Sequence, residues 1–333
     1  MTPDHDPYHS DITVRLALAF TISLTFLYIA PFYISPTLKT TPVNSRDSPN
    51  VIRARVKAVG GTGLISVLAA IYLFTVYGQD SPRDIIRLLG IAPVFFDDIL
   101  KTLALVAILF VGPLYESLIV DGEWREFTPK NFKHNFYDSW VGYRNHVVAP
   151  ISEEIIFRSL TISMFLSAET DPFRIVFMTP LIFGLAHIHH LVEFVRSKTP
   201  ANRTMPPPNI LFVGIIRSLF QFTYTSLFGF FAAFIFMRTA NIWACIAAHS
   251  FCNYMGVPRF WGRVGQDDDH YSDVTPDVAQ GKREDGARVS GHGGTAPKNL
   301  SIGWTVVYYA LLLVGSYTFY QLLWPWTESD NGF

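Results

Sequence analysis

The chain has 333 residues, of which half are hydrophobic and only 16% are charged, whereas a soluble domain carries roughly 25% charged residues. The net charge is -1, which gives no electrostatic basis for binding nucleic acid. The shortage of charge falls in long apolar runs, so composition excludes an ordinary soluble protein and favours one that crosses a membrane several times.

Eight apolar runs are each about the 20 residues needed to cross the hydrocarbon core of a membrane. The sequence therefore predicts an all-α fold: a polytopic membrane helical bundle of about eight transmembrane helices around a polar cavity, in one integral membrane domain over residues 1–333. The sixth and seventh runs merge, so the segment 238–241 is an alternative turn between them. The predicted runs are 12–34, 56–77, 99–118, 147–166, 175–191, 210–231, 234–257 and 302–324.

The segments between the runs predict a short helix, a loop and an orientation. Ser81-Pro82 is typical of a helix start, and the residues that follow predict a helix either at the membrane interface or packed against the bundle. Residues 262–299 are polar, which is typical of a flexible loop. Most basic residues follow the first, third, fifth and seventh runs, so we expect those loops in the cytosol and both termini on the other side.

The most informative feature is a group of three charges in the fourth run, Glu153, Glu154 and Arg158. Ionisable residues at membrane depth are costly and are expected to face a cavity or a partner. In a helix, Glu154 and Arg158 have the i,i+4 spacing of an ion pair, which leaves Glu153 as the free carboxylate. Pro150 is expected to break or kink the helix. A helix that restarts there holds both glutamates in its first turn, where the dipole favours their ionised form.

A structural salt bridge, or a loop end outside the bilayer, would explain a single Glu–Arg pair equally well. One arginine cannot neutralise two carboxylates, however, so the second glutamate favours a functional site. A carboxylate held ionised despite burial is suited to taking a proton from water.

Two further polar clusters occur in later runs. His187 lies one turn deeper than His189 and His190, which could simply mark the end of a span. His249 and Asn253 share a helix face through their i,i+4 spacing, and two donors on one face can bind a developing oxyanion. A packing histidine and a polar helix–helix contact are the structural alternatives for these positions.

Other functions remain open at this point. One glutamate and two histidines match a known zinc ligand set, although the chain lacks the H-E-x-x-H motif that would pre-arrange two ligands. A proton-coupled transporter that uses the buried glutamate and histidines as a relay is a second alternative, and the absence of internal repeats makes it the poorer fit. A non-catalytic scaffold for lipidated peptides is a third.

The three clusters occur together and in order: Glu153-Glu154-x-x-x-Arg158, Phe183-x-x-x-His187 and His249-x-x-x-Asn253. This ordered set resembles that of the type II CAAX prenyl endopeptidase family, the Rce1-like glutamate proteases. The resemblance covers roughly residues 144–253, inside a motif-bearing core of about 144–256, without a departure at the motif positions.

The resemblance implies a multi-pass endopeptidase of the endoplasmic reticulum membrane that uses no cofactor and no metal. Its partners would be farnesylated or geranylgeranylated CAAX proteins, such as small GTPase-like proteins, from which it would remove the last three residues. By the same resemblance, Glu153 and His187 would activate the water. His249 and Asn253 would stabilise the oxyanion. Glu154 and Arg158 would support the site.

Overall fold

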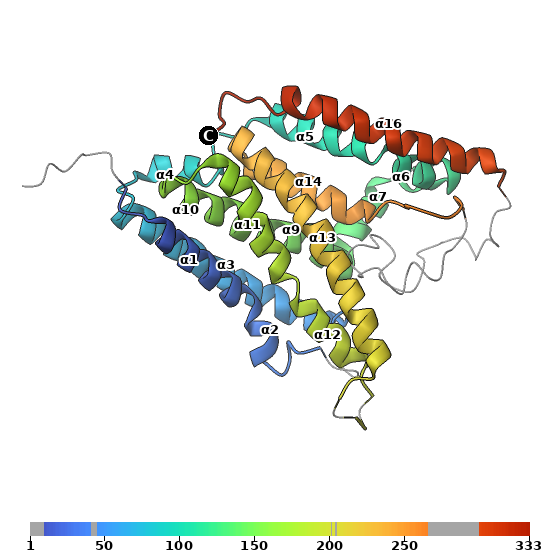
Figure 1. Cartoon of the computed structure of the whole chain (residues 1–333), viewed down its shortest axis with the longest axis horizontal. Coiled ribbons are helices and arrows are strands. Elements are labelled where there is room, and N and C mark those ends of the chain that lie inside the picture. The colour runs from blue at the N-terminus through green and yellow to red at the C-terminus, as the bar shows by residue number, and fades with distance from the viewer. Residues whose placement is uncertain (1–9, 41–44, 201, 204, 266–299) are drawn as a thin grey trace, which may run out of the picture.

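The computed structural model describes residues 10–40, 45–200, 202–203, 205–265 and 300–333, and within them the fold is entirely helical (Figure 1). The predicted all-α class is confirmed. The predicted flexible loop falls mostly on residues 266–299, which lie outside the described residues. The α-helices are α1 (Val14–Ile29), α2 (Pro31–Ile34), α3 (Pro49–Val76), α4 (Pro82–Leu88), α5 (Phe96–Leu109), α6 (Val111–Tyr115), α7 (Pro129–Lys133), α8 (Trp140–Tyr143), α9 (Ala149–Glu154), α10 (Thr161–Ser167), α11 (Pro172–Ala186), α12 (His189–Lys198), α13 (Pro208–Thr239), α14 (Ile242–Met255) and α16 (Ile302–Trp326).

Short turns of other helical types connect or interrupt these helices. In the part of the chain that the structure describes, η1 (Glu116–Val120), η3 (His134–Asp138), η4 (Arg144–Val148) and η5 (Ile155–Leu160) are π-helical turns, and η2 (Glu123–Glu126) is a 3₁₀ turn.

Within the described residues, five helical stretches are long and apolar enough to cross a membrane, and a bent pair makes a sixth candidate. The chain is therefore a multi-pass membrane protein by the composition of its helices. The bent pair consists of α5 and residues 111–120, which meet at 76° where the third run was predicted. The five stretches are Val14–Ile34, Pro49–Val76, Pro172–Lys198, Pro208–Thr239 and Ile302–Trp326.

The predicted boundary between the sixth and seventh runs is wrong, and the alternative turn is correct. α13 continues to Thr239, and the turn falls at Ala240, whose φ of 44° is left-handed. Asn241 then caps α14, because its side chain accepts from two backbone N–H groups of the first turn. α14 has 14 residues, or about 21 Å at 1.5 Å per residue, which is shorter than a hydrocarbon core of roughly 30 Å.

The fourth predicted run forms one uneven helix, in which η4, α9, η5 and α10 follow one another without leaving the right-handed helical region. Of the break or kink predicted at Pro150, the break does not occur. The N–H of Ala149 donates to Arg144 O in a wider π-type turn directly before the proline. This local change of hydrogen-bond register accommodates the missing proline N–H, and such turns are frequent at functional sites.

The short helix α4 packs against this uneven helix. Ser81 caps α4 as the sequence predicts. The hydroxyl of Ser159 donates to Leu89 O at 2.7 Å, and that of Ser163 donates to Leu88 O at 2.6 Å. Of the two expected positions for this helix, the structure supports packing against the bundle.

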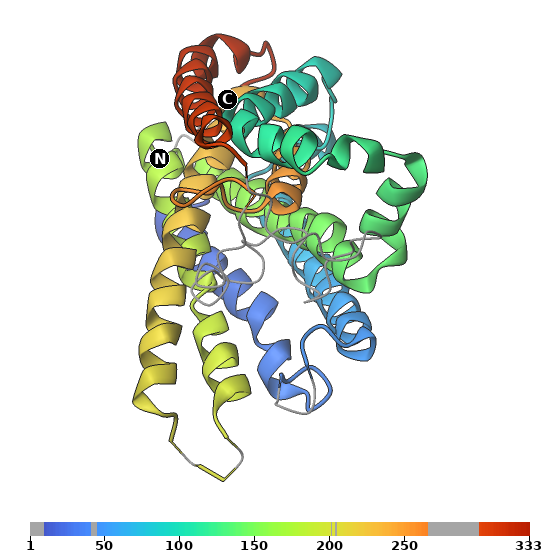
Figure 2. The ribbon, with the colours of Figure 1, turned by 90° about the vertical axis from the view of Figure 1, so that its right-hand side faces the viewer.

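Two glycines allow α11 and α13 to approach each other closely. A Cβ added to Gly184 would collide with Ser226 Oγ, and one added to Gly229 would lie 2.7 Å from Pro180 Cβ. α11 and α12 follow one another along the length of α13 (Figures 1 and 2), while α14 packs against α13 and α9 on one side and α5 on the other. This arrangement brings the helices that carry the three polar clusters into contact.

Candidate active site

The buried side of the first cluster is a tight group of three side chains. Glu154 is fully buried, and its Oε1 lies 3.1 Å from Arg158 Nη1. His249 Nδ1 donates to the same oxygen at 2.6 Å. The i,i+4 ion pair expected from the sequence is thus present, and the bond between Glu154 and His249 joins α9 to α14.

Aromatic rings enclose the arginine of this group. The guanidinium carbon of Arg158 lies 4.3 Å from the ring centroid of Phe183 and 5.5 Å from that of Phe228. Ring faces attract cations, so the guanidinium is held by the Glu154 carboxylate and by two rings. The orientation of Glu154 toward α14 is fixed as a result.

The other glutamate faces an open space. Oε2 of Glu153 lies 3.9 Å from Nε2 of His187 and 3.9 Å from Nε2 of His249. These separations are too long for direct hydrogen bonds, but a bridging water can span them. The Glu153 carboxylate therefore lies between two imidazole nitrogens without a direct hydrogen bond to either.

A backbone contact sets the orientation of one of these imidazoles. Nδ1 of His187 donates to Phe183 O at 2.8 Å, and a carbonyl oxygen can only accept. A neutral His187 therefore presents the lone pair of Nε2 toward Glu153. The backbone carbonyl four residues earlier thus fixes the orientation of the His187 ring.

The third cluster is tied to the turn before α9. Nδ2 of Asn253 donates to Asn145 O at 2.9 Å, and the Ser250 hydroxyl donates to His146 O at 2.6 Å. An amide nitrogen carries two hydrogens, so the bond to Asn145 leaves Asn253 with a second N–H to donate.

One cavity of about 560 Å³ has Glu153, His187, His249 and Asn253 in its wall, a size typical of ligand sites. The structure thus brings together four predicted residues from α9, the end of α11 and α14. Glu154 and Arg158 lie behind Glu153 and are not among the lining residues.

The rest of the wall is mostly apolar, with one cationic end. Among the described residues, the charged side chains in the wall are Glu153 and three arginines, Arg46, Arg55 and Arg144. The aromatic part of the wall includes Phe110, Phe157, Phe220, Phe228, Phe231 and Phe319. The cavity can therefore hold a ligand that is largely apolar and carries a small polar part.

The sequence did not indicate a contribution from the first helix. Tyr28 of α1 lines the cavity, and its hydroxyl lies 2.9 Å from Ser152 Oγ. Because Ser152 Oγ donates to Val148 O at 2.8 Å, the tyrosine is the donor to the serine. A phenol inside an apolar run is a weak signal that could have suggested this role.

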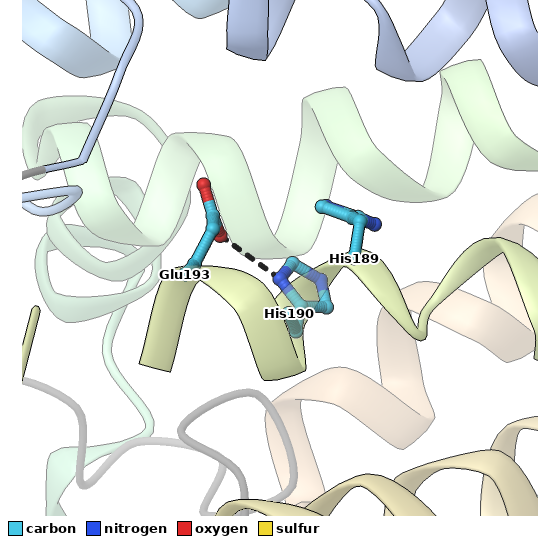
Figure 3. A group of neighbouring side chains, drawn as sticks. All are labelled: His189, His190 and Glu193. Carbon is cyan, nitrogen blue, oxygen red and sulfur yellow. Dashed lines mark hydrogen bonds and ion pairs between the residues drawn. The ribbon is translucent and has the colours of Figure 1, made fainter. Parts of the chain in front are cut away.

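A second histidine group lies at the cationic end. His189, His190 and Glu193 offer ligand atoms within 4.8 Å of one another, the spacing of a possible metal site. Figure 3 shows Glu193 directed toward His190, whose Nδ1 is 3.0 Å from Oε2. The other carboxylate oxygen lies 2.5 Å from Arg55 Nη2. The positive charge of Arg55 at this position would repel a divalent metal ion. The group therefore fits a role in balancing the charge of Arg55 better than a metal site.

Comparisons with known proteins point to one family, and the similarity to its members extends over most of the chain. The family described as "Type II CAAX prenyl endopeptidase Rce1-like" matches residues 98–255, which include all four cavity residues above. CAAX prenyl protease 2 of Saccharomyces cerevisiae is 30% identical over 72% of this chain and 81% of the relative. This chain belongs to the type II CAAX prenyl endopeptidase family.

Further relatives extend the likeness beyond the matched segment. Probable CAAX prenyl protease 2 of Schizosaccharomyces pombe is 29% identical over 92% of each chain. CAAX prenyl protease 2 of Homo sapiens is 34% identical over 64% of each chain. No solved structure matched this chain. As a member of the CAAX prenyl endopeptidase family, the protein is a membrane protease.

Proposed function

We propose that this protease removes the C-terminal aaX tripeptide from farnesylated or geranylgeranylated CAAX proteins, with Glu153 and His187 as the groups that activate water. The observation that carries the proposal is the position of Glu153, 3.9 Å from Nε2 of both His187 and His249 in one cavity. A water between Glu153 and His187 can lose a proton to either acceptor as it attacks the scissile carbonyl. The protonated base then returns that proton to the leaving amine.

Negative charge develops on the carbonyl oxygen during this attack and needs donors. Asn253 supplies its second amide N–H. His249 supplies Nε2–H when it is protonated on both nitrogens, and Glu154 balances that charge through its 2.6 Å contact with Nδ1. Arg158 in turn balances Glu154. The ion pair is thus a positioning group for the oxyanion donor.

The apolar wall suits the lipid of the substrate. A prenyl chain needs a slot without unpaired polar groups, and the aromatic part of the cavity wall provides such a surface. Glu153, His187, His249 and Asn253 line the same cavity, so a substrate whose lipid lies against the aromatic wall can present its peptide bond to them.

A cleavage assay tests the proposal. Purified protein in lipid nanodiscs is incubated with a farnesylated CAAX peptide, and mass spectrometry should detect the released tripeptide. The matched peptide without the lipid should be cleaved far more slowly. Absence of cleavage by folded protein contradicts the proposal. Loss of activity on dialysis against a strong chelator, with recovery on adding zinc, would replace water activation by Glu153 with a metal mechanism.

The membrane arrangement is a further part of the proposal. The helix 144–167 and α14 complete eight crossings of a single integral domain, in the endoplasmic reticulum, with both termini lumenal and the basic loops cytosolic. Support comes from the contacts of both segments with helices long enough to span and from the basic-residue bias. Glycosylation tags fused to each terminus test it: both should be glycosylated in cells, and an unmodified tag contradicts the orientation.

A further inference from the structure

One buried polar side chain in the cavity wall has no role in the chemistry above. Gln221 of α13 lines the cavity and is only 4% exposed. Among the described residues, none forms a hydrogen bond with its side-chain amide. The hydroxyl of Thr225, one turn further along, donates to the backbone oxygen of Gln221 at 2.7 Å instead. The amide therefore keeps its donor and its acceptor for a ligand in the cavity.

An amide at this position costs free energy of folding. Polar groups buried without a hydrogen-bond partner are destabilising, and nearly all buried polar groups in proteins are paired. Neighbouring wall residues of α13 avoid this cost. Phe220 and Phe228 are apolar, and the hydroxyl of Thr223 donates to Leu219 O of its own helix at 2.9 Å. Gln221 differs from these neighbours because it leaves its polar atoms to the cavity.

Two close contacts show how α13 lies along α11 and α12 (Figures 1 and 2). A Cβ added to Gly214 would lie 2.8 Å from Leu191 Cδ1 in α12. The close approach of Gly229 to Pro180 lies further along α13 but earlier in the chain on α11. The helices are therefore antiparallel, and Gln221 lies about midway between these two contacts.

The same interval of the opposing helices contains His187, which ends α11. His187 also lines the cavity, with its Nε2 3.9 Å from Glu153 Oε2. The packing register therefore places Gln221 near the level of the groups that activate water. A substrate group bound to Gln221 would thus lie close to the scissile bond.

We propose that the side-chain amide of Gln221 binds a main-chain peptide group of the substrate that flanks the scissile bond. This inference rests on the proposed function, because it states how that substrate is held. A prenyl chain offers no hydrogen-bonding group, whereas a peptide offers an N–H and a C=O at each residue other than proline. The glutamine amide can accept from the first and donate to the second. Such a contact positions the substrate without selecting a particular aaX sequence.

The first test combines a change in the substrate with a change in the protein. In a farnesylated CAAX peptide, the peptide group on either side of the scissile bond is replaced, one at a time, by an ester, which removes its N–H. One of the two esters should lower the kcat/KM of the wild type by about 2- to 10-fold, the range for one neutral hydrogen bond. Gln221→Met should show at least that loss with the normal peptide and no further loss with that ester. Gln321→Met is the matched control, because Gln321 is exposed on α16 and is not a lining residue, and it should keep the wild-type values.

The same rates distinguish failure of this inference from failure of the proposed function. If Gln221→Met leaves kcat/KM unchanged, or if its loss multiplies with the loss from each ester, the inference is overturned while the proposed function stands. If the wild type does not cleave the normal peptide, the proposed function itself fails. Gln221→Asn keeps the amide on a shorter side chain, should lose part of the rate, and substitutes for a Gln221→Met variant that fails to fold.

A stability measurement tests the alternative that Gln221 only supports packing. An amide without a protein partner contributes no hydrogen bond to the fold, and replacing it by an apolar side chain can be neutral or stabilising. The unfolding midpoint of substrate-free Gln221→Met should therefore equal or exceed that of the wild type, although the variant cleaves more slowly. A lower midpoint together with independent rate losses would make Gln221 a packing residue and overturn the inference.

Discussion

The two neighbouring glutamates of α9 occupy opposite environments. Glu154 is fully buried, in contact with Arg158 at 3.1 Å and with His249 at 2.6 Å. Glu153 lines the cavity and has its two imidazole neighbours at 3.9 Å. One side of the helix is closed and packed against protein groups, whereas the other faces the cavity.

Two adjacent residues of the same type can thus have different roles: Glu154 stabilises the helix packing, whereas Glu153 is placed for chemistry. Neighbouring side chains on a helix point about 100° apart, so one register step moves a carboxylate from an ion pair to a cavity. The closed side should respond to mutation through stability and the open side through rate. Each experiment below tests that separation.

A substitution on the closed side should have the largest effect, because it should lower both the stability and the activity of the protein. Glu154→Gln leaves Arg158 as a buried charge without its carboxylate, and breaking a buried pair in this way costs about 3–5 kcal/mol. We expect a marked fall in the free energy of unfolding, measured by thermal or denaturant unfolding in detergent, together with lost activity. Glu328→Gln, at an exposed position, is the control. An unchanged unfolding midpoint in Glu154→Gln would remove the distinction between the two sides.

The oxyanion donor should show a smaller effect, in rate alone. Asn253→Ala should reduce kcat by about 10²–10³-fold, the range for one such donor. Ser250→Ala is the matched control, because Ser250 makes the equivalent helix-to-backbone bond one turn earlier, to His146 O. If both variants lose kcat to the same degree, Asn253 acts only as a tether for α14.

The contact from α1 should show the smallest effect. Tyr28→Phe removes the 2.9 Å bond to Ser152 Oγ and should lower the free energy of unfolding by about 0.5–1.5 kcal/mol. Unfolding measurements and a parallel rate assay check this, with kcat expected to change little. A loss of kcat as large as that of Asn253→Ala would instead place Tyr28 among the reacting groups.

Features that depend on local helix geometry could be predicted from the sequence. The Glu154–Arg158 pair follows from i,i+4 spacing. The cap at Ser81 follows from local chemistry in the same way. The ordered motifs also predicted which four residues meet in one cavity, although spacing alone did not bring α9, α11 and α14 together.

Features that depend on packing between distant segments could not be predicted. The bond between Glu154 and His249 joins residues 95 positions apart, and no periodicity reports it. The cationic end combines Arg46 and Arg144, whose shared partner Asp47 lies in a polar segment before α3. The break considered at Pro150 does not occur, because a π-helical turn, which leaves no signal in the sequence pattern, accommodates the missing N–H.

The central claim is that Glu153 activates the attacking water while Glu154 holds the site together. The most direct test is the single-turnover cleavage rate of a farnesylated CAAX peptide by Glu153→Gln, with the unfolding midpoint measured on the same sample. We predict a rate reduced by about 10²–10⁴-fold, the usual contribution of a general base, and a midpoint equal to that of the wild type. A rate near the wild-type value in folded protein would contradict the claim.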